Sequence, residues 1–232
     1  MTEQVRPEIL ISRLTADNET WRVEAETRLV ALGQAAVDPL IGALQHAHPS
    51  VRVHAVHALS QIKEPRGIPA VVSALADTEN SGAVAIAAEK ALINWGEEVK
   101  PALIDAASHG PEHVRPRALR ALGRIGGDDL QPLLQPLLQD RSAAVRTQAA
   151  GALAAALQER SIALIAPLLQ DADKWVRYGV AEALVRCGSV RGESVLREAK
   201  DDAEEQGGYL SHWAEELLDE IEELKRTGRA IA

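Results

Sequence analysis

The sequence contains one cysteine, no phenylalanine and few aromatic residues of any kind. A single cysteine cannot form a disulfide within the chain, and it excludes a metal site built from clustered cysteines. Aromatic residues make up 3% of the 232 residues, so a deep cavity lined by aromatic rings is not expected. Much of the hydrophobic content is alanine, which suits thin layers of closely packed helices.

An excess of positive charge is also missing. The formal net charge is −9, which excludes the overall basic footprint of a DNA- or RNA-binding protein. The N-terminus shows no basic region followed by an apolar run, so no signal peptide is predicted. No stretch approaches the roughly 18 apolar residues of a membrane span. We therefore expect a cytoplasmic monomer without a nucleic-acid or membrane partner.

What the sequence does contain is one short pattern repeated six times. It reads apolar residue, Arg, two variable residues, Ala, two variable residues, small residue and Leu. The Arg position falls at 22, 52, 85, 115, 146 and 177, with Ala85 in place of Arg in the third copy. This is a period of about 31 residues, and repetition at such a period predicts an α-solenoid rather than separate globular cores.

Each repeat is expected to form a helix, a turn and a second helix. Apolar residues spaced by three or four place one stripe on each helix. Prolines fall near the start of the first helices, and glycines fall where second helices must end. The predicted repeats are 5–33, 34–63, 64–96, 97–126, 127–157 and 158–188. Together they form an array over residues 1–188, and residues 189–232 form a C-terminal pair of acidic helices.

These repeats resemble HEAT repeats, and their length is similar to that of the short HEAT-like repeats of phycobilin lyases. The resemblance covers roughly residues 5–188. It implies an all-α, right-handed, armadillo-like α-solenoid whose second helices line the concave surface. It does not extend to HEAT-like hydroxylases that bind iron through His-Glu pairs, because no histidine in this chain is followed by glutamate.

The resemblance also implies a ladder, in which an Asp of the inter-helix turn bonds the Arg of the second helix. The matching pairs are Asp140 with Arg146 and Asp171 with Arg177. Asp77 lacks an Arg in its own repeat, and we expect it to borrow Arg52 or Arg115 from a neighbouring repeat.

No catalytic constellation with a usable spacing is present, and neither a catalytic residue nor a cofactor is predicted. His54 and His57 share one helix face and could hold a metal with a third ligand, for which His46 or His48 is a candidate. The alternative is that they are surface histidines, and no metal site is predicted. Cys187 falls at a core position, which favours a small buried hydrophobic residue over a nucleophile.

The solvent face of the second helices is the candidate binding surface. The strip of Val53, Val56, Ile86 and Leu119 forms an apolar groove rimmed by charge, unless neighbouring repeats cover it. Arginine suits recognition of carboxylate or phosphate, although a basic helix face can also be merely solvated. The predicted binding residues are Val53, Val56, His57, Lys90, Arg117, Leu119, Arg120 and Tyr178. Trp175 and Tyr178 either pack against the C-terminal helices or contact a ligand.

The predicted function is a non-catalytic scaffold or adaptor that binds a protein partner on its concave face. The alternative follows from the resemblance: a phycobilin lyase-like protein that binds an open-chain tetrapyrrole and aids its attachment to or removal from a phycobiliprotein. In that case Arg117 and Arg120 would hold the propionates of the bilin. The acidic C-terminal helices either cap the array or dock a basic partner.

Overall fold

The protein is all-α, as the sequence predicts. The computed structural model describes residues 6–79, 82–187, 190–205 and 210–227, and these residues contain no β-strand. They divide into two compact units, 1–121 and 122–232, called here the N-terminal body and the C-terminal body. Each body is described by itself.

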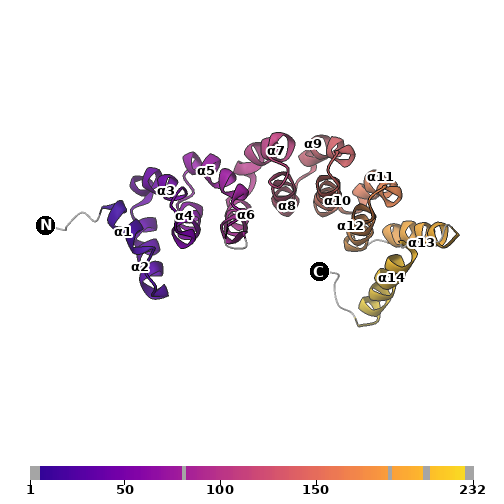
Figure 1. The fold of residues 1–232 in the computed structure, drawn as a ribbon. Helices are drawn as coiled ribbons and strands as arrows, with labels where there is room; N and C mark the ends of the chain where they lie inside the picture. Colours follow the sequence, from indigo (N-terminus) through magenta and orange to yellow (C-terminus); the bar gives the residue numbers. More distant parts are fainter. Residues whose placement is uncertain (1–5, 80–81, 188–189, 206–209, 228–232) are drawn as a thin grey trace. The chain divides into compact units, whose positions relative to one another are not determined.

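The N-terminal body holds the first helices of the repeats in one layer and the second helices in another (Figure 1). The first helices are α1 (Pro7–Arg13), α3 (Val37–Ala43), α5 (Ile68–Ser73) and α7 (Lys100–His109). The second helices are α2 (Glu19–Ala31), α4 (Pro49–Ile62), α6 (Ala83–Trp95) and α8 (Arg115–Ile125), whose last residues belong to the C-terminal body. Second helices pack against their neighbours, α2 against α4 and α4 against α6.

The C-terminal body continues the alternation. Its helices are α9 (Gln131–Leu134), α10 (Ala143–Leu157), α11 (Ile162–Ile165), α12 (Lys174–Arg186), α13 (Val190–Glu205) and α14 (Leu210–Thr227). Helix α10 packs against α12, and α14 packs against both α12 and α13. The C-terminal helices therefore lie against the second helix of the last repeat.

The first helices are shorter than the second ones, and those of the fifth and sixth repeats are flanked by 3-10 segments. Helix α9 has four residues and is flanked by 3-10 turns at Asp128–Leu130 and Gln135–Gln139. Pro132 and Pro136 stand in the first turn of α9 and of the following 3-10 segment, respectively, where a missing N–H costs no intrahelical bond. The first-helix layer is thus made of short helical segments, whereas each second helix is one longer continuous helix.

The repeated pattern forms the core. The Leu that ends each copy is at most 1% exposed: Leu29, Leu59, Leu92, Leu122, Leu153 and Leu184. The central small residue of each copy is buried as well: Ala25, Ala55, Ala88, Ala118, Ala149 and Val180. Burying one leucine side chain contributes about 2 kcal/mol, while alanine keeps neighbouring helices close. The sequence pattern is therefore the packing pattern.

One stretch departs from the expectation about membrane spans. By length and composition Ala143–Gln170 could cross a membrane, with a mean hydropathy of 1.4 and half of that window buried. Its helix is interrupted at Gln158, which has φ 54° and ψ −132°, and exposed Glu159 and Arg160 follow. Helix α10 alone has 15 residues, fewer than the about 20 that a span needs, and it packs against α12. The buried apolar residues of α10 are part of the protein core.

The C-terminal helices begin slightly differently from the prediction. The sequence offers Ser211 as the N-cap of a last helix whose apolar stripe is Trp213, Leu217, Ile221 and Leu224. In the structure Ser211 lies within α14, which already includes Leu210. Leu217, a member of the predicted apolar stripe, is buried. The side chains of Trp213, Ile221 and Leu224, the other members of that stripe, lie outside the described residues.

Candidate functional site

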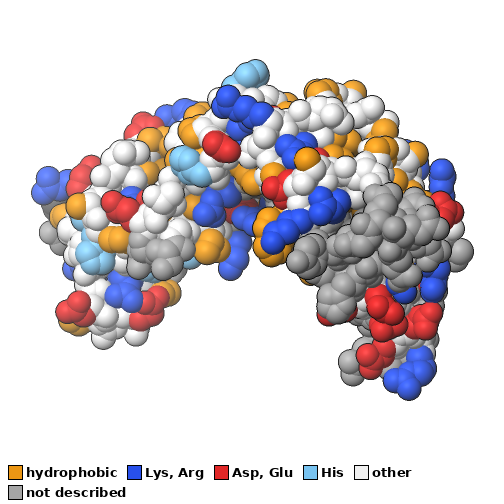
Figure 2. Space-filling view, turned by 45° about the vertical axis from the view of Figure 1, so that its right-hand side comes forward, with side chains coloured by type: hydrophobic (Ala, Val, Ile, Leu, Met, Phe, Trp, Pro, Cys, Tyr) orange, Lys and Arg blue, Asp and Glu red, His pale blue; other side chains and the backbone are white. Residues whose placement is uncertain are grey.

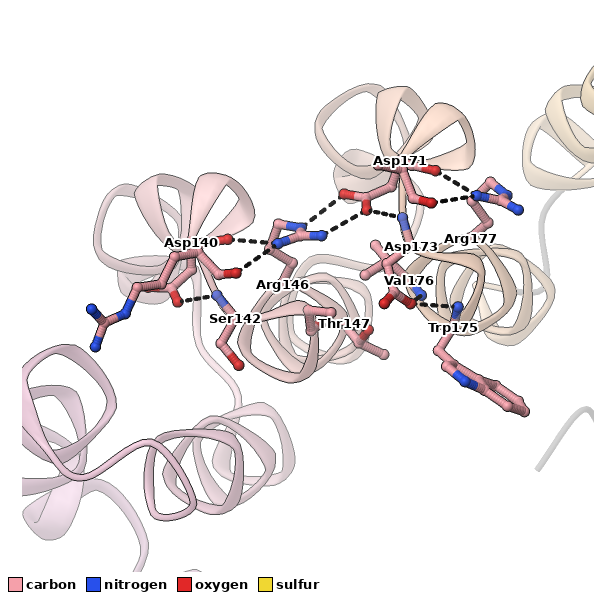
Figure 3. Close-up of polar contacts among 12 residues, drawn as sticks. Asp140, Ser142, Arg146, Thr147, Asp171, Asp173, Trp175, Val176 and Arg177 are labelled. Carbon is pink, nitrogen blue, oxygen red and sulfur yellow. Dashed lines mark hydrogen bonds and ion pairs between the residues drawn. The ribbon is translucent and has the colours of Figure 1, made fainter.

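An Arg–Asp ladder links successive repeats in the C-terminal body (Figure 3). The Nη1 atom of Arg146 donates to the backbone carbonyl of Asp140 in its own repeat, at 2.8 Å. Its Nε and Nη2 atoms donate to the two carboxylate oxygens of Asp171 in the next repeat, at 2.8 and 2.7 Å. Arg177 donates in turn to the backbone carbonyl of Asp171, at 2.6 Å. The resemblance implies that the carboxylate of each aspartate bonds the arginine of its own repeat, and this expectation is wrong. The carboxylate of Asp171 bonds the arginine of the preceding repeat, while the backbone carbonyls of Asp140 and Asp171 bond the arginines of their own repeats.

The same rule holds in the N-terminal body. The Nε atom of Arg52 donates to Oδ2 of Asp77 at 2.7 Å, and its Nη1 atom donates to the carbonyl of His46 at 2.8 Å. The prediction that Asp77 borrows a neighbouring arginine is therefore confirmed, with Arg52 as the donor. Arg52 also donates to Glu79 at 2.6 Å. Its guanidinium is nearly fully buried and has several acceptors.

The ladder is incomplete at the first repeat. Arg22 donates to the carbonyls of Ala16 and Asp17, as the later arginines do in their repeats. The next turn, however, carries His46 at the position that Asp77, Asp140 and Asp171 occupy in their own turns. Within the described residues, the Nε atom of Arg22 is buried without a hydrogen-bond partner. The missing carboxylate explains this unpaired donor.

The predicted binding strip divides into exposed and buried positions. Counted from the Arg position, the fourth residue of each second helix faces the neighbouring second helix, and Val56 and Leu119 are 0% exposed there. The prediction that these two residues lie in an open groove is wrong, because stacking of the repeats covers them. The first and fifth positions remain accessible: Val53 is half-buried, Ile86 is 47% exposed, and Lys90 is exposed.

The accessible positions form two rows across α4, α6 and α8, and we call this surface the recognition face. The first positions make an apolar row of Val53 and Ile86, while the fifth positions make a basic row of His57, Lys90 and Arg120. Ile86 and Lys90 are four residues apart on α6, so they share one face. Figure 2 shows hydrophobic side chains beside Lys and Arg on the surface in view.

Arg120 of the recognition face and the nearby Arg117 have different surroundings. Arg120 donates from Nε and Nη2 to both oxygens of Glu89, at 2.7 and 2.8 Å. This paired hydrogen bonding raises the pKa of Arg120 above its usual value. The half-buried Arg117 lies over the start of α6, because a methyl group on Gly82 would come within 3.4 Å of its Nη2 atom. Arg117 thereby extends the face beyond Ile86.

A second polar cluster lies between α2 and α4. Nδ1 of His54 donates to Oε2 of Glu26 at 2.6 Å, and Nδ1 of His57 lies 3.8 Å from the same oxygen. Gln61 donates to Oε1 of Glu26 at 3.0 Å. Burial alone would raise the pKa of the Glu26 carboxyl, but the histidine contacts outweigh it and lower that pKa to about 2. The carboxylate is thus charged at neutral pH.

The cluster gives His54 and His57 a different third partner from the expected one. His46 and His48 were the candidates, but their Nδ1 atoms accept hydrogen bonds from the backbone N–H groups of His48 and Ser50, respectively, in the turn before α4. The third group comes from Glu26, on the previous second helix. A sequence signal for it exists, because Glu26 and Glu89 both occupy the fourth position after the Arg position of their repeats.

Tyr178 belongs to the C-terminal body and is half-buried on α12. Its neighbour Trp175 is 61% exposed, so most of this indole is open to solvent. Lys174 lies over the Trp175 ring, with its Nζ atom 5.2 Å from the ring centroid. Asp173 caps α12 by accepting from the backbone N–H groups of Trp175 and Val176.

Cys187 is a buried residue, as its position in the repeat predicts. It is 9% exposed, and its Sγ atom lies 3.6 Å from the hydroxyl of Ser161. Burial raises the pKa of the thiol, which disfavours the thiolate that a nucleophile requires.

Comparison with known proteins agrees with this architecture. A family model for HEAT repeats matches residues 7–93, 78–154 and 130–218. The last match extends past residue 188, where the sequence pattern fades. A search among curated proteins finds no match.

Several solved structures resemble the chain. A chain from the complex of CpcE and CpcF of phycocyanin lyase from Nostoc sp. PCC7120 is 24% identical, with 94% of this chain and 96% of that chain covered and a TM-score of 0.45. The archaeal HEAT-like repeats protein from Thermococcus onnurineus NA1 is 13% identical, with 96% and 99% covered and a TM-score of 0.49. Human deoxyhypusine hydroxylase is 20% identical, with 94% and 96% covered and a TM-score of 0.39.

These likenesses concern the fold, whereas the family model matches this sequence itself over most of its length. Its matches cover the helix pairs, the buried leucines and the arginine ladder described above. The chain belongs to the HEAT-repeat family.

Proposed function

We propose that the protein is a non-catalytic interaction module that binds an acidic, extended segment of a partner protein on its recognition face. The observation that carries this proposal is the pairing of an apolar row with a basic row on adjacent second helices. Ile86 is 47% exposed at the centre of the apolar row. Lys90 is exposed one helical turn further along α6. A helix face that met only water would need no such apolar residue.

The spacing of the rows suits an extended chain. Packed helices lie about 10 Å apart, so the fifth positions of α4, α6 and α8 repeat at roughly that interval. A polyproline II segment advances about 3.1 Å per residue with three residues per turn, so every third side chain points the same way and would meet the next helix. A carboxylate at every third position would face His57, Lys90 and Arg120 in succession, with apolar side chains between them meeting Val53 and Ile86.

Charge favours the same partner. The chain carries a net charge of −9, so an acidic segment would be repelled by most of the surface. Lys90 and Arg117 give the recognition face the opposite sign, and Arg120 brings its own counter-ion in Glu89. Electrostatic complementarity of this kind steers association and selects the register of binding.

The test is selection of peptides from a random displayed library on the purified protein. We expect enrichment of peptides with Asp or Glu at every third position and apolar residues between them. Lys90→Glu should weaken binding of the selected peptides by at least about tenfold, which corresponds to about 1.4 kcal/mol. Because Lys90 is exposed, thermal unfolding should shift little. Binding would be measured by fluorescence anisotropy.

The matched control is Arg13→Glu. Arg13 is exposed in the last turn of α1, in the first-helix layer and away from the recognition face, and its substitution changes the net charge equally. Arg13→Glu should bind the selected peptides like the parent. Equal weakening by both substitutions would mean that overall charge, not this face, governs binding, and the proposal would fail. Arg120→Glu is unsuitable, because it places a carboxylate against Glu89.

The phycobilin lyase-like alternative makes a different prediction for the same protein. Titration with biliverdin, an open-chain tetrapyrrole, should leave the absorption spectrum of the pigment unchanged if the recognition face binds peptides. A spectral shift that Lys90→Glu or Arg117→Glu abolishes would instead favour a bilin held by its propionates.

A further inference from the structure

The Glu26–His54–His57 cluster brings together three groups that ligate transition metals. Glu26 lies on α2, and both histidines lie on α4, three residues apart. One possible ligand atom from each residue lies within 4.8 Å of the others. Two imidazoles and a carboxylate form the ligand set that many three-residue zinc sites use.

The carboxylate is already oriented toward the histidines. Gln61 holds Oε1 of Glu26 at 3.0 Å, and Oε2 is left to face the two imidazoles at 2.6 and 3.8 Å. The side chains of Glu26 and His54 are 13% and 10% exposed, so neither samples many rotamers. Such supporting contacts fix the ligands of a metal site before the ion arrives.

Comparison with the equivalent place two repeats along, between α6 and α8, shows that packing does not require two histidines. There Glu89, at the same repeat position as Glu26, is satisfied by Arg120 alone, and Arg120 occupies the position of His57. The position of His54 is occupied there by Arg117, which lies over Gly82 instead. One ion pair is therefore enough to join two neighbouring second helices. Two histidines offer two nitrogen atoms that could bind a metal ion.

We propose that Glu26, His54 and His57 bind one divalent transition-metal ion of the zinc class. Ligands about 2.0–2.1 Å from a tetrahedral ion lie roughly 3.3 Å apart, which the cluster reaches by small side-chain adjustments. Two imidazoles favour zinc, cobalt or nickel over magnesium and calcium, which prefer oxygen. His57 is 45% exposed, so the fourth position opens to solvent and can take water or a ligand from a partner. The ion would tie α2 to α4.

The experiment is calorimetric titration of the chelator-treated full-length protein with Zn²⁺, followed by the same titration with Co²⁺ monitored by visible absorption. We expect one ion per chain and the intense absorption bands of tetrahedral Co²⁺. Glu26→Gln and His57→Ala should each weaken Zn²⁺ binding by at least about tenfold. Zn²⁺ should also raise the unfolding temperature of the parent more than that of either variant.

His109→Ala serves as the control. His109 pairs with Asp105 at 3.0 Å on the surface of α7, and among the described residues no third ligand joins this histidine and carboxylate. Its substitution should leave the titration unchanged. The solvent-exposed His57 side chain makes His57→Ala a variant that should fold, which circular dichroism would verify. If the parent binds Zn²⁺ no more tightly than Glu26→Gln and His57→Ala do, the site does not exist. Peptide binding to the recognition face is measured separately and does not decide this result.

Discussion

At the scale of single residues, the ladder arginines do more than neutralise charge. Arg146 joins the turn of its own repeat to the turn of the next one through Asp171, and both side chains are largely buried, at 16% and 9% exposed. A bidentate pair of this kind fixes geometry as well as energy. Removing one partner leaves the other charge without its counterpart in a mostly dry place.

We predict that Asp171→Ala lowers the free energy of unfolding by about 2 kcal/mol, between the values for surface and fully buried pairs. The measurement is urea unfolding followed by circular dichroism. Asp128→Ala is the matched control, because Asp128 pairs with Arg160 across the same two repeats but both side chains are exposed. It should cause no measurable change. Equal losses in both variants would show that the ladder carries no special stability.

The Arg146–Asp171 pair also predicts a dependence on pH. The hydrogen bond from Arg146 lowers the pKa of the Asp171 carboxyl in the folded state, relative to about 3.9 in the unfolded chain. The stabilisation is therefore complete above about pH 4 and is lost as the pH falls through the folded pKa. The difference in unfolding free energy between the parent and Asp171→Asn should shrink from pH 7 to pH 3. A constant difference over that range would contradict this assignment.

At the scale of helix pairs, close packing rests on small residues. A methyl group on Gly179 of α12 would lie 2.4 Å from Cγ2 of Thr147 on α10, which is closer than carbon atoms tolerate. Thr147 also donates its hydroxyl to the carbonyl of Ala143 at 2.9 Å. The glycine is thus needed for contact between the helices rather than for backbone freedom.

Gly179→Ala should therefore destabilise the parent by about 1–3 kcal/mol through overpacking. In a Thr147→Ser background the clashing Cγ2 is gone while the hydroxyl remains. The same Gly179→Ala change should then stabilise the protein by up to about 1 kcal/mol, because alanine favours helix over glycine. A double-mutant cycle from thermal unfolding measures this reversal of sign. Additive effects would show that the contact with Thr147 is not the cause.

At the scale of the whole molecule, contacts are made mainly between neighbouring repeats, so stability should be local. Amide hydrogen exchange read by mass spectrometry can test this. Asp171→Ala should speed exchange in α10 and α12 while leaving α2 and α4 close to the parent. Bound Zn²⁺ should slow exchange in α2 and α4 and leave α12 unchanged. A uniform change along the chain in either case would contradict local stability.

The sequence alone determined the helix pairs, the buried leucines and alanines and the family, because each repeat presents the same periodic pattern and periodicity dictates which face is buried. It also predicted that Asp77 borrows an arginine from a neighbouring repeat, because its own repeat carries Ala85 at the Arg position. The sequence placed the recognition face on a set of second helices but did not identify which of their residues are accessible. A hydrophobic pattern does not state whether Val56 faces solvent or the next helix.

Only the tertiary structure decided the contacts between repeats. It buried Val56 and Leu119, paired Arg120 with Glu89, and directed the carboxylate of Asp171 to Arg146 rather than to Arg177. It also brought Glu26 to His54 across 28 residues of sequence. Helical periodicity fixes the direction of a side chain around its own helix axis, but a contact between helices depends also on their spacing and relative shift along the axis, and those are set by how the side chains of neighbouring repeats interlock.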